Sequence, residues 1–344
     1  MNVHIAGIGC VTPLGGDLDT IWRRIEAGER AAVVEVTNPE TGRKLCAALV
    51  PAEYTAHLGR EPRLRRSSAI SLLAAAAGKA ALADSGSEFS PAQKSRLAIV
   101  FGVSSGGVQY TRRFYEQIVK QGANTASPML FPETVYNAPA SHLAAMLGVD
   151  GATYTLVGDG TVGLQALHFG TQLLELGDAD HVLVVAAEEL DWALIEAHRD
   201  WRLARPGKGA LLAEGAAAVL LGHDGRRGKI ASHPGESFIS RREAPAALDR
   251  VFTALKPDGG VDIFASGANG TWVDALLRSA AARHLTSPAP RELAAKEFLG
   301  EAIGAGALLQ VVLATDALER QSASNALVAA LGWNQQAAGA LISR

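Results

Sequence analysis

The stretch Thr153-Tyr-Thr-Leu-Val157 is followed directly by Gly158-Asp-Gly-Thr-Val-Gly163 and then by Leu164-Gln-Ala-Leu167. The β-branched residues of the first part predict a strand, the glycines a tight turn, and the last part the start of an amphipathic helix. Such a turn either presents a nucleophile or binds a phosphate at the helix N-terminus. Because this turn holds no obvious nucleophile, two interpretations compete: a dinucleotide-binding loop, or an enzyme site that has lost its nucleophile.

Composition narrows the possible functions. The 344 residues, 48% of them hydrophobic, can bury a large core, and the length predicts two domains or one domain made of two halves. A formal net charge of -3 argues against a nucleic-acid partner. The densest basic run, Arg60 to Arg66, suits a solvated loop or a docking site for an acidic carrier protein. No signal peptide or membrane span is evident, so we expect a cytoplasmic protein.

The cysteines predict neither a disulfide framework nor a metal site. Only Cys10 and Cys46 occur, and neither belongs to a metal-binding motif. We therefore expect no metal and no cofactor.

Strand-like and Ala/Leu-rich helical runs alternate, which predicts an α/β fold with helices covering a mainly parallel sheet. The second half repeats the order of the first: 262–266 with its glycines matches 98–107, 296–317 matches 158–176, and 325–342 matches the hairpin predicted at 211–221. This repetition favours a duplicated α/β unit. The remaining expected elements are strands at 3–8, 96–103 and 181–187 and helices at 20–26, 67–84, 111–120 and 138–147.

The glycine turn fits the pattern of a dinucleotide-binding loop, because Gly158, Gly160 and Gly163 have the required spacing between a strand and a helix. Two features oppose this interpretation. The ribose-binding acid should close the next strand about 20 residues further on, and Glu188 and Glu189 come later than that. The loop also follows some 150 residues of α/β structure rather than opening its domain. A dinucleotide-binding oxidoreductase is therefore the weaker alternative.

Four separated blocks stand out along the sequence: Val3-His-Ile-Ala-Gly-Ile-Gly-Cys-Val-Thr-Pro-Leu-Gly15, Ser127-Pro-Met-Leu-Phe-Pro-Glu-Thr-Val-Tyr-Asn137, Glu214-Gly-Ala-Ala-Ala-Val219 and residues 296–306. In order and spacing these blocks resemble the β-ketoacyl-ACP synthases of the thiolase fold. The resemblance implies a duplicated, layered α-β-α-β-α architecture, with one half at 1–225 and a shortened second half at 226–344.

By this resemblance the catalytic residues are missing. The family uses a nucleophilic Cys at a strand-to-helix turn and two His residues that assist decarboxylation and stabilise the oxyanion. Alignment of the motifs places Gly160 at the Cys position and Ser266 and Glu301 at the two His positions, while a family Lys is retained as Lys296. Trp333 stands where a gating Phe is usual. These losses imply a subunit that is inactive alone.

Two further segments are Ser104-Ser-Gly-Gly-Val-Gln-Tyr-Thr-Arg-Arg-Phe-Tyr115 and Leu156-Val-Gly-Asp-Gly-Thr-Val-Gly-Leu-Gln-Ala-Leu167. By these segments the chain looks, among degenerate synthases, most like the chain-length factors of type II polyketide and polyene synthases. The resemblance implies a heterodimer with a Cys-bearing ketosynthase subunit, served by an acyl carrier protein, in which this chain lines the tunnel for the growing acyl chain. Val108, Thr111 and Tyr115 would point into that tunnel, with Phe131 as a further candidate. Their i, i+3, i+7 spacing places the first three on one helical face, which suits a tunnel wall or a core equally.

Two alternatives stay open. Ser266, Glu301 and Lys296 could converge and give a homodimer with acyl hydrolase or acyltransferase activity. The chain could instead be a homodimeric acyl-binding protein. The sequence does not reveal the product, its length or the partner.

Overall fold

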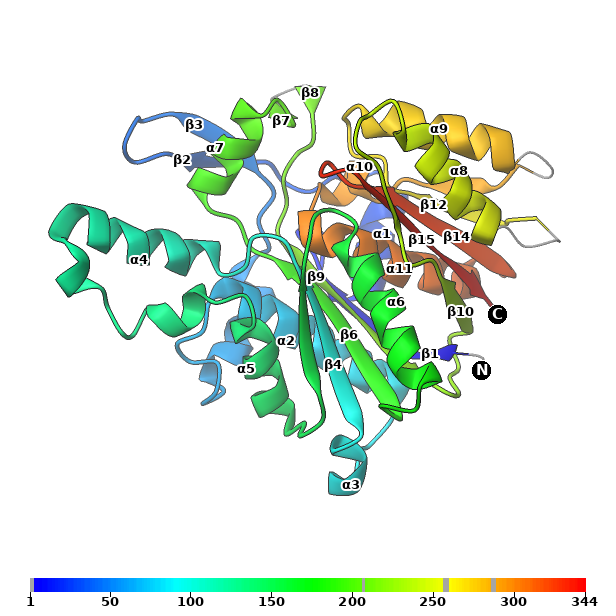
Figure 1. Cartoon of the computed structure of the whole chain (residues 1–344), viewed down its shortest axis with the longest axis horizontal. Helices are drawn as coiled ribbons and strands as arrows, with labels where there is room; N and C mark the ends of the chain where they lie inside the picture. Colours follow the sequence, from blue (N-terminus) through cyan, green and yellow to red (C-terminus); the bar gives the residue numbers. More distant parts are fainter. Residues whose placement is uncertain (1–2, 206–207, 256–259, 286–288) are drawn as a thin grey trace.

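The computed structural model describes residues 3–205, 208–255, 260–285 and 289–344 (Figure 1). The strands are β1 (Val3–Val11), β2 (Val34–Thr37), β3 (Lys44–Ala47), β4 (Leu97–Val103), β5 (Thr153–Val157), β6 (His181–Glu188), β7 (Ala204–Arg205), β8 (Lys208–Gly209), β9 (Gly215–Gly222), β10 (Lys229–Ser232), β11 (Glu236–Ser237), β12 (Ile263–Ser266), β13 (Arg291–Leu293), β14 (Asn325–Leu331) and β15 (Gln336–Ser343). The α-helices are α1 (Leu18–Glu26), α2 (Ala69–Ser85), α3 (Pro91–Lys94), α4 (Val108–Gln121), α5 (Ala138–Leu147), α6 (Val162–Glu175), α7 (Trp192–Asp200), α8 (Ala244–Leu255), α9 (Val273–His284), α10 (Lys296–Leu299) and α11 (Ile303–Arg320), and the 3-10 helices are η1 (Ala52–Tyr54), η2 (Ala56–Arg60), η3 (Ala123–Thr125) and η4 (Phe131–Thr134).

The main sheet consists of two sets of strands with the same topology. The first set has the order β5-β4-β6-β9-β1 and the second β13-β12-β14-β15-β10. In both sets the strands lie in the order third, second, fourth, fifth, first along the chain. The directions also agree: two parallel pairings are followed by two antiparallel ones. This agreement confirms the duplicated α/β unit. The connection from Gly222 to Lys229 separates the sets, and the division at residues 225 and 226 stays a prediction.

Two details of the predicted fold were wrong. The sheet is mixed rather than mainly parallel, because β9 in the first set and β15 in the second run antiparallel to the strands on both sides of them. Residues 211–221 form no hairpin: β9 is one fully buried strand between β1 and β6. The glycine at its start suggested a turn, but the small residues after it let helices pack closely on both faces. The hairpin predicted at 325–342 is confirmed as β14 and β15.

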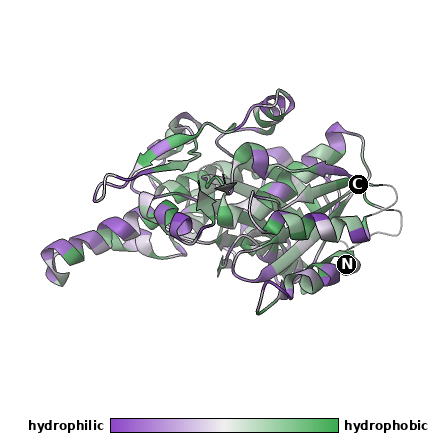
Figure 2. Cartoon of the chain, turned by 90° about the horizontal axis from the view of Figure 1, so that it is seen from above, coloured by the Kyte–Doolittle hydropathy of each residue, from purple (hydrophilic) through white to green (hydrophobic). Residues whose placement is uncertain are grey.

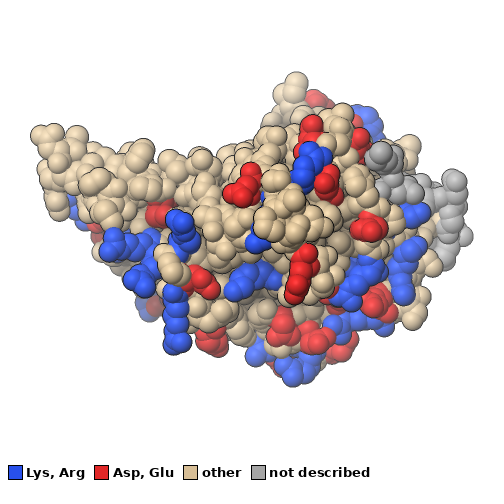
Figure 3. All heavy atoms as spheres, turned by 90° about the horizontal axis from the view of Figure 1, so that it is seen from below, with Lys and Arg blue, Asp and Glu red and all other residues tan. Residues whose placement is uncertain are grey.

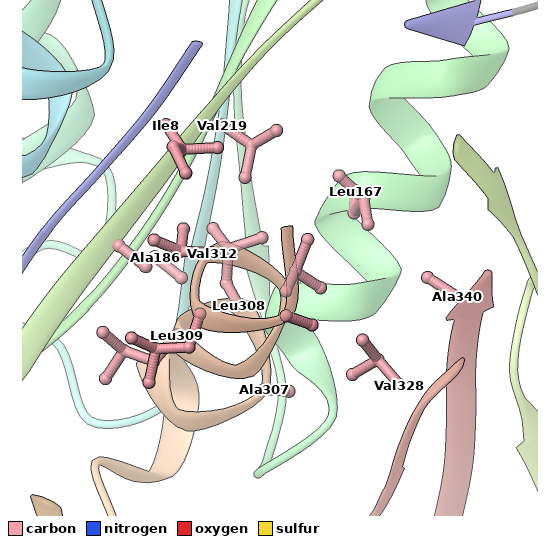
Figure 4. Close-up of a cluster of buried hydrophobic side chains, with 14 of the residues drawn as sticks. Ile8, Leu167, Ala186, Val219, Ala307, Leu308, Leu309, Val312, Val328 and Ala340 are labelled. Carbon is pink, nitrogen blue, oxygen red and sulfur yellow. The ribbon is translucent and has the colours of Figure 1, made fainter. Parts of the chain in front are cut away.

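The helices form layers around the two strand sets, which confirms the layered α/β architecture (Figure 1). The α2 and α5 helices cover the outer side of the first set, and α8 and α9 the outer side of the second. Between the sets lie α6 and α11, which contact strands of both. Each leucine buried in this middle layer stabilises the fold by about 1.5–3 kcal/mol. Figure 4 shows this core with Ile8, Leu167, Ala186, Val219, Ala307, Leu308, Leu309, Val312, Val328 and Ala340 labelled.

A projecting arm, residues 108–136, leaves the body through α4, η3 and η4. No side chain of α4 is buried. Figure 2 shows the arm extending from the body, with its helix coloured mainly hydrophilic. Glu133 anchors the base of the arm, because its carboxylate accepts the Ser68 N–H at 2.8 Å and lies 2.6 Å from Nε2 of His142. Arg112 holds the other side through Asp191, with both carboxylate oxygens 2.9 Å from Nε.

Among the described residues, none of the helices combines the length and the apolar character that crossing a membrane requires.

Candidate functional site

The turn between β5 and α6 lies at the ends of the strands, beside the start of α11 and the β14–β15 turn. At Gly160 a Cβ atom would lie 3.9 Å from the Ile303 carbonyl oxygen and 4.0 Å from Cα of Gly332, which is ordinary contact. The φ angle of Gly160 is also not among the positive ones. Neither space nor backbone conformation therefore requires glycine at this position, and the turn keeps room for a side chain that it lacks.

The other glycines of the turn are explained by packing. A Cβ atom at Gly163 would lie 2.9 Å from the backbone nitrogen of Leu308, so glycine lets α6 and α11 approach closely. The carboxylate of Asp159 lies at this helix start. It accepts hydrogen bonds from the Thr161 N–H at 3.1 Å and from the Asn334 N–H at 2.8 Å. Because the chain's own carboxylate occupies this position, the geometry gives no support to a phosphate or dinucleotide there.

These two glycines predict opposite responses to alanine. Gly160→Ala should leave the free energy of unfolding unchanged or raise it by up to about 1 kcal/mol, because the unfolded chain loses freedom. Gly163→Ala should lower it by about 1–3 kcal/mol, because its methyl group overpacks the α6–α11 contact. Urea unfolding of both variants checks this. Equal destabilisation by the two substitutions would contradict the open space at Gly160.

A chain of hydrogen bonds joins the second set of predicted site residues. Trp333 Nε1 donates to Thr271 Oγ1 at 3.3 Å, and Thr271 Oγ1 donates to Asn269 Oδ1 at 2.7 Å. Asn269 Nδ2 donates to Glu301 Oε2 at 2.8 Å, and Lys296 Nζ donates to the same oxygen at 2.7 Å. Lys296 and Glu301 are both buried. The structure thus brings together Glu301, Lys296 and Trp333 in one hydrogen-bonded network.

Ser266 lies apart from this network although it is fully buried at the end of β12. Its Oγ accepts the Ala268 N–H at 3.3 Å, and its carbonyl oxygen accepts from Gln310 Nε2. Its hydrogen bonds do not include Lys296 or Glu301. A serine nucleophile needs a base within hydrogen-bond reach. The predicted convergence of Ser266, Glu301 and Lys296 is therefore incomplete, since only the last two meet.

Trp333 sits under the end of α7. Its ring centroid lies 5.5 Å from that of His198, which in turn lies 5.1 Å from that of Trp201. Burial lowers the pKa of His198, while its hydrogen bond with the Leu194 carbonyl and the charge of Glu301 oppose that shift. The aromatic cluster covers the network from the α7 side, as a gate residue would require. Its role as a gate stays a prediction.

Comparison with known proteins now places the chain. Residues 1–224 match the family model of the β-ketoacyl synthase N-terminal domain. The chain belongs to the β-ketoacyl synthase family. Of curated relatives, the 3-oxoacyl-[acyl-carrier-protein] synthase 2 of Vibrio cholerae is 26% identical over 192 residues. The match covers 55% of this chain and 46% of that protein, so this synthase-family chain spans about half the length of its curated relative.

Solved structures extend the likeness over the whole chain at the level of fold. A β-ketoacyl synthase from Burkholderia phymatum superposes with a TM-score of 0.86 at 19% identity, covering 100% of this chain and 99% of that one. The ishigamide ketosynthase/chain length factor gives a TM-score of 0.84 at 21% identity, with the same coverage. Both confirm the thiolase-like fold of the family.

In this synthase-family chain the turn and the network stand at the positions that the resemblance assigned to catalysis. Gly160 provides no thiol, and Ser266 and Glu301 provide no imidazole. The two cysteines lie elsewhere: Cys10 is buried in β1, and burial raises its thiol pKa, while Cys46 is exposed in β3. Among the described residues, no group of three or more His, Cys, Asp or Glu side chains could hold a metal ion.

Buried carboxylates that sequence reasoning did not assign hold this site together. Glu188 Oε1 accepts the Ser105 N–H at 2.9 Å, and its Oε2 accepts the Gly304 N–H at 3.1 Å. It thereby ties the loop after β4 to the start of α11. Burial raises the pKa of Glu188 to about 7, although these backbone donors oppose the rise. A sequence signal existed, since an acidic pair directly after a fully apolar strand rarely faces solvent.

This shifted pKa predicts a pH-dependent stability. Folded Glu188 keeps a proton between the ordinary carboxyl pKa and about 7, whereas the unfolded chain has lost it. Its stabilising effect is therefore full below that window and falls as the pH rises through it. Glutamine does not titrate, so the Glu188→Gln variant lacks this fall in stability. The free energy of unfolding of the variant minus that of wild type should therefore rise by about 1–3 kcal/mol between about pH 5 and about pH 7.5. Urea unfolding across this range measures the difference, in which the shared histidine titrations cancel. A constant difference would contradict the raised pKa.

The predicted tunnel residues all lie on the projecting arm. Val108 and Thr111 are half-buried, whereas Tyr115 is 59% and Phe131 54% exposed. Phe114 lies between the last two, with ring centroids 5.8 Å from Tyr115 and 5.7 Å from Phe131. These residues therefore do not fill a core of this chain. Whether they line an acyl tunnel stays a prediction, because such a tunnel would need a second wall.

Proposed function

We propose that this chain is a non-catalytic chain-length factor, which pairs with a Cys-bearing ketosynthase subunit and shapes the acyl tunnel of the complex. The observation that carries the proposal is the state of the nucleophile turn. The turn keeps its strand, its helix, its close packing and the space at Gly160, yet it has no thiol. A scaffold kept in this form without its catalytic groups serves a partner that has them.

A partner surface supports the pairing. The outermost strand of the first set, β5, pairs among the described strands with β4 alone, and its Tyr154 and Val157 are 38% and 54% exposed. The α5 helix packs against both β5 and η4, so this edge adjoins the base of the arm. The arm also exposes Val119 and Met129. On the face shown in Figure 3, the projecting end carries few charged side chains. An unpaired sheet edge with exposed apolar side chains beside it suits an interaction site.

The arm then supplies one wall of the tunnel in this proposal. Val108, Thr111 and Tyr115 share one face of α4. Val108 lies at the start of the helix, nearest the body, and Tyr115 lies further out along the arm. A partner seated on the β5 edge would close the space over this face. The bulky ring of Tyr115 would limit its depth.

The acyl groups would come from an acyl carrier protein. The name of the Vibrio cholerae relative states that it acts on acyl-carrier-protein. The basic run at residues 60–66 lies next to the arm, because Tyr110 on α4 donates to the Arg66 carbonyl oxygen at 3.1 Å. Such a basic surface suits an acidic carrier.

Product length tests the proposal. In the complex reconstituted with its ketosynthase, Val108→Trp should shift the product to shorter chains, because a larger side chain in a closed tunnel excludes carbons. Mass spectrometry of the products measures the shift. Arg113→Trp, which adds the same ring to another side of α4, is the matched control and should leave the distribution unchanged. An unchanged distribution for Val108→Trp with an intact dimer would remove α4 from the tunnel.

The purified chain alone separates the proposal from its alternative. As a chain-length factor it should take up no acyl group from an acyl carrier protein, and Gly160→Cys alone should not make it a condensing enzyme. Intact-mass measurements detect acylation. Acylation of the wild-type chain at Ser266 would instead favour the homodimeric hydrolase or acyltransferase.

A further inference from the structure

A pocket lies between β3, α7 and the segment before β9, and none of the residues assigned to the catalytic positions lines it. It has a volume of about 350 Å³ and is walled mainly by apolar residues. Leu45 and Ile195 form part of a small buried cluster beneath it, and Val33 is 61% exposed beside it. Ligand pockets in proteins have volumes of about 300–1,000 Å³ and place a few polar groups in apolar walls.

Two cations line this pocket, and they differ in their partners. Lys44 pairs with Glu35 at 3.0 Å. Arg199 forms no ion pair among the described residues, and its Nη1 is buried without a hydrogen-bond partner. The acidic residues nearest in sequence, Asp200 and Glu196, both lie by Arg43 instead, at 3.9 Å for Asp200, and Glu196 also accepts from Asn38. A guanidinium with an unsatisfied donor at an apolar pocket lacks an anionic acceptor.

We propose that this pocket binds a carboxylate with an aliphatic chain, the carboxylate at Arg199 and the chain along Leu45, Ile195 and Leu211. The side chain of Arg199 is partly exposed, so a turn of its outer torsions presents two nitrogens to the ligand. Guanidinium and carboxylate match in a two-pronged hydrogen bond. Val33, Gly209 and Leu211 also line a neighbouring pocket of about 450 Å³, which gives a longer chain room to extend.

Cys46 provides a direct readout because it lines the pocket and is exposed, whereas Cys10 is buried and serves as an internal reference. The experiment measures the rate at which iodoacetamide alkylates Cys46 in the full-length chain, by peptide mass spectrometry, as octanoate is added. Octanoate should slow the alkylation of Cys46 at least about fivefold at saturation, and octanol, which lacks the carboxylate, should not.

Two substitutions locate the site. Arg199→Met should weaken the protection by octanoate at least about tenfold. Arg278→Met, which removes an exposed cation that does not line the pocket, should leave it unchanged. Ile195→Trp fills the pocket while keeping Arg199 and should also abolish protection, which covers the case that Arg199→Met fails to fold. Absence of protection in the wild type, equal protection by octanol, or full protection in Ile195→Trp would each overturn the proposal.

Discussion

We expect Lys296→Met to lower the free energy of unfolding by about 3–5 kcal/mol, because it leaves the Glu301 carboxylate buried without its counter-ion. The side chains of Lys296 and Glu301 are 6% and 3% exposed, and their charged atoms lie 2.7 Å apart. Within the described part of the chain, Oε1 of Glu301 already lacks a hydrogen-bond partner, and Asn269 would remain as the donor to the carboxylate. Urea unfolding of the purified variant measures the loss.

A double variant separates the cost of the unpaired charge from the value of the pair. Lys296→Met with Glu301→Leu removes both charges and keeps the volume roughly constant, so its stability should lie near that of wild type. Gly306 makes room for the pair, because a Cβ there would approach Glu301 Oε1 to 2.6 Å. A single variant as stable as wild type would show that the pair is hydrated and not part of the core.

This test also bears on function. If Lys296 and Glu301 serve only to fill the former catalytic cavity, the double variant should pair with the ketosynthase and give the same products as wild type. A pair that acts in acyl transfer would lose that activity on removal, whatever its stability. The stability and product measurements together therefore distinguish a structural ion pair from a catalytic one.

The fold was predictable from the order of strands, turns and helices along the chain, whereas the pairing of the strands in the sheet was not. Repetition of strand, glycine turn and helix in the two halves is a local signal, and it led to the duplicated unit. Strand direction is not a local property. The β9 strand lies between β1 and β6 in the sheet, although more than 200 residues separate it from β1 along the chain. The Gly-Ala run at 211–221 therefore suggested a hairpin although it forms a single central strand.

The site was predictable where a motif has a fixed place and unpredictable where polar partners come from distant segments. Gly160, Glu301, Lys296 and Trp333 could be named from the motifs. The bonds that join Thr271 and Asn269 to them could not, because they connect segments about 30 and about 60 residues apart. The role of Glu188 in tying two segments together was not predicted for the same reason, since its partner Gly304 lies 116 residues further on.

The exposed edge of β5 predicts the second large effect, which is loss of the partner in Thr155→Pro. The carbonyl of Ala152 accepts from Ile99, and the N–H of Gly158 donates to Val103, so even-numbered residues of this segment face β4. Alternate residues of a strand point their backbone groups to opposite sides, and the N–H of Thr155 therefore points outward. Proline at this position removes a donor that the chain itself does not use, and edge strands tolerate it.

The variant should fold like wild type yet bind the ketosynthase at least about a hundredfold more weakly, because strand addition at a sheet edge depends on the outward backbone groups. Thr155→Val keeps the N–H and is the matched control. Co-purification with a tagged ketosynthase, followed by size-exclusion chromatography with light scattering, measures the pairing. A Thr155→Pro chain that still forms the full heterodimer would place the partner elsewhere, with the arm as the next surface to change. Loss of pairing with retained folding would place the ketosynthase on β5, where it closes the space over α4.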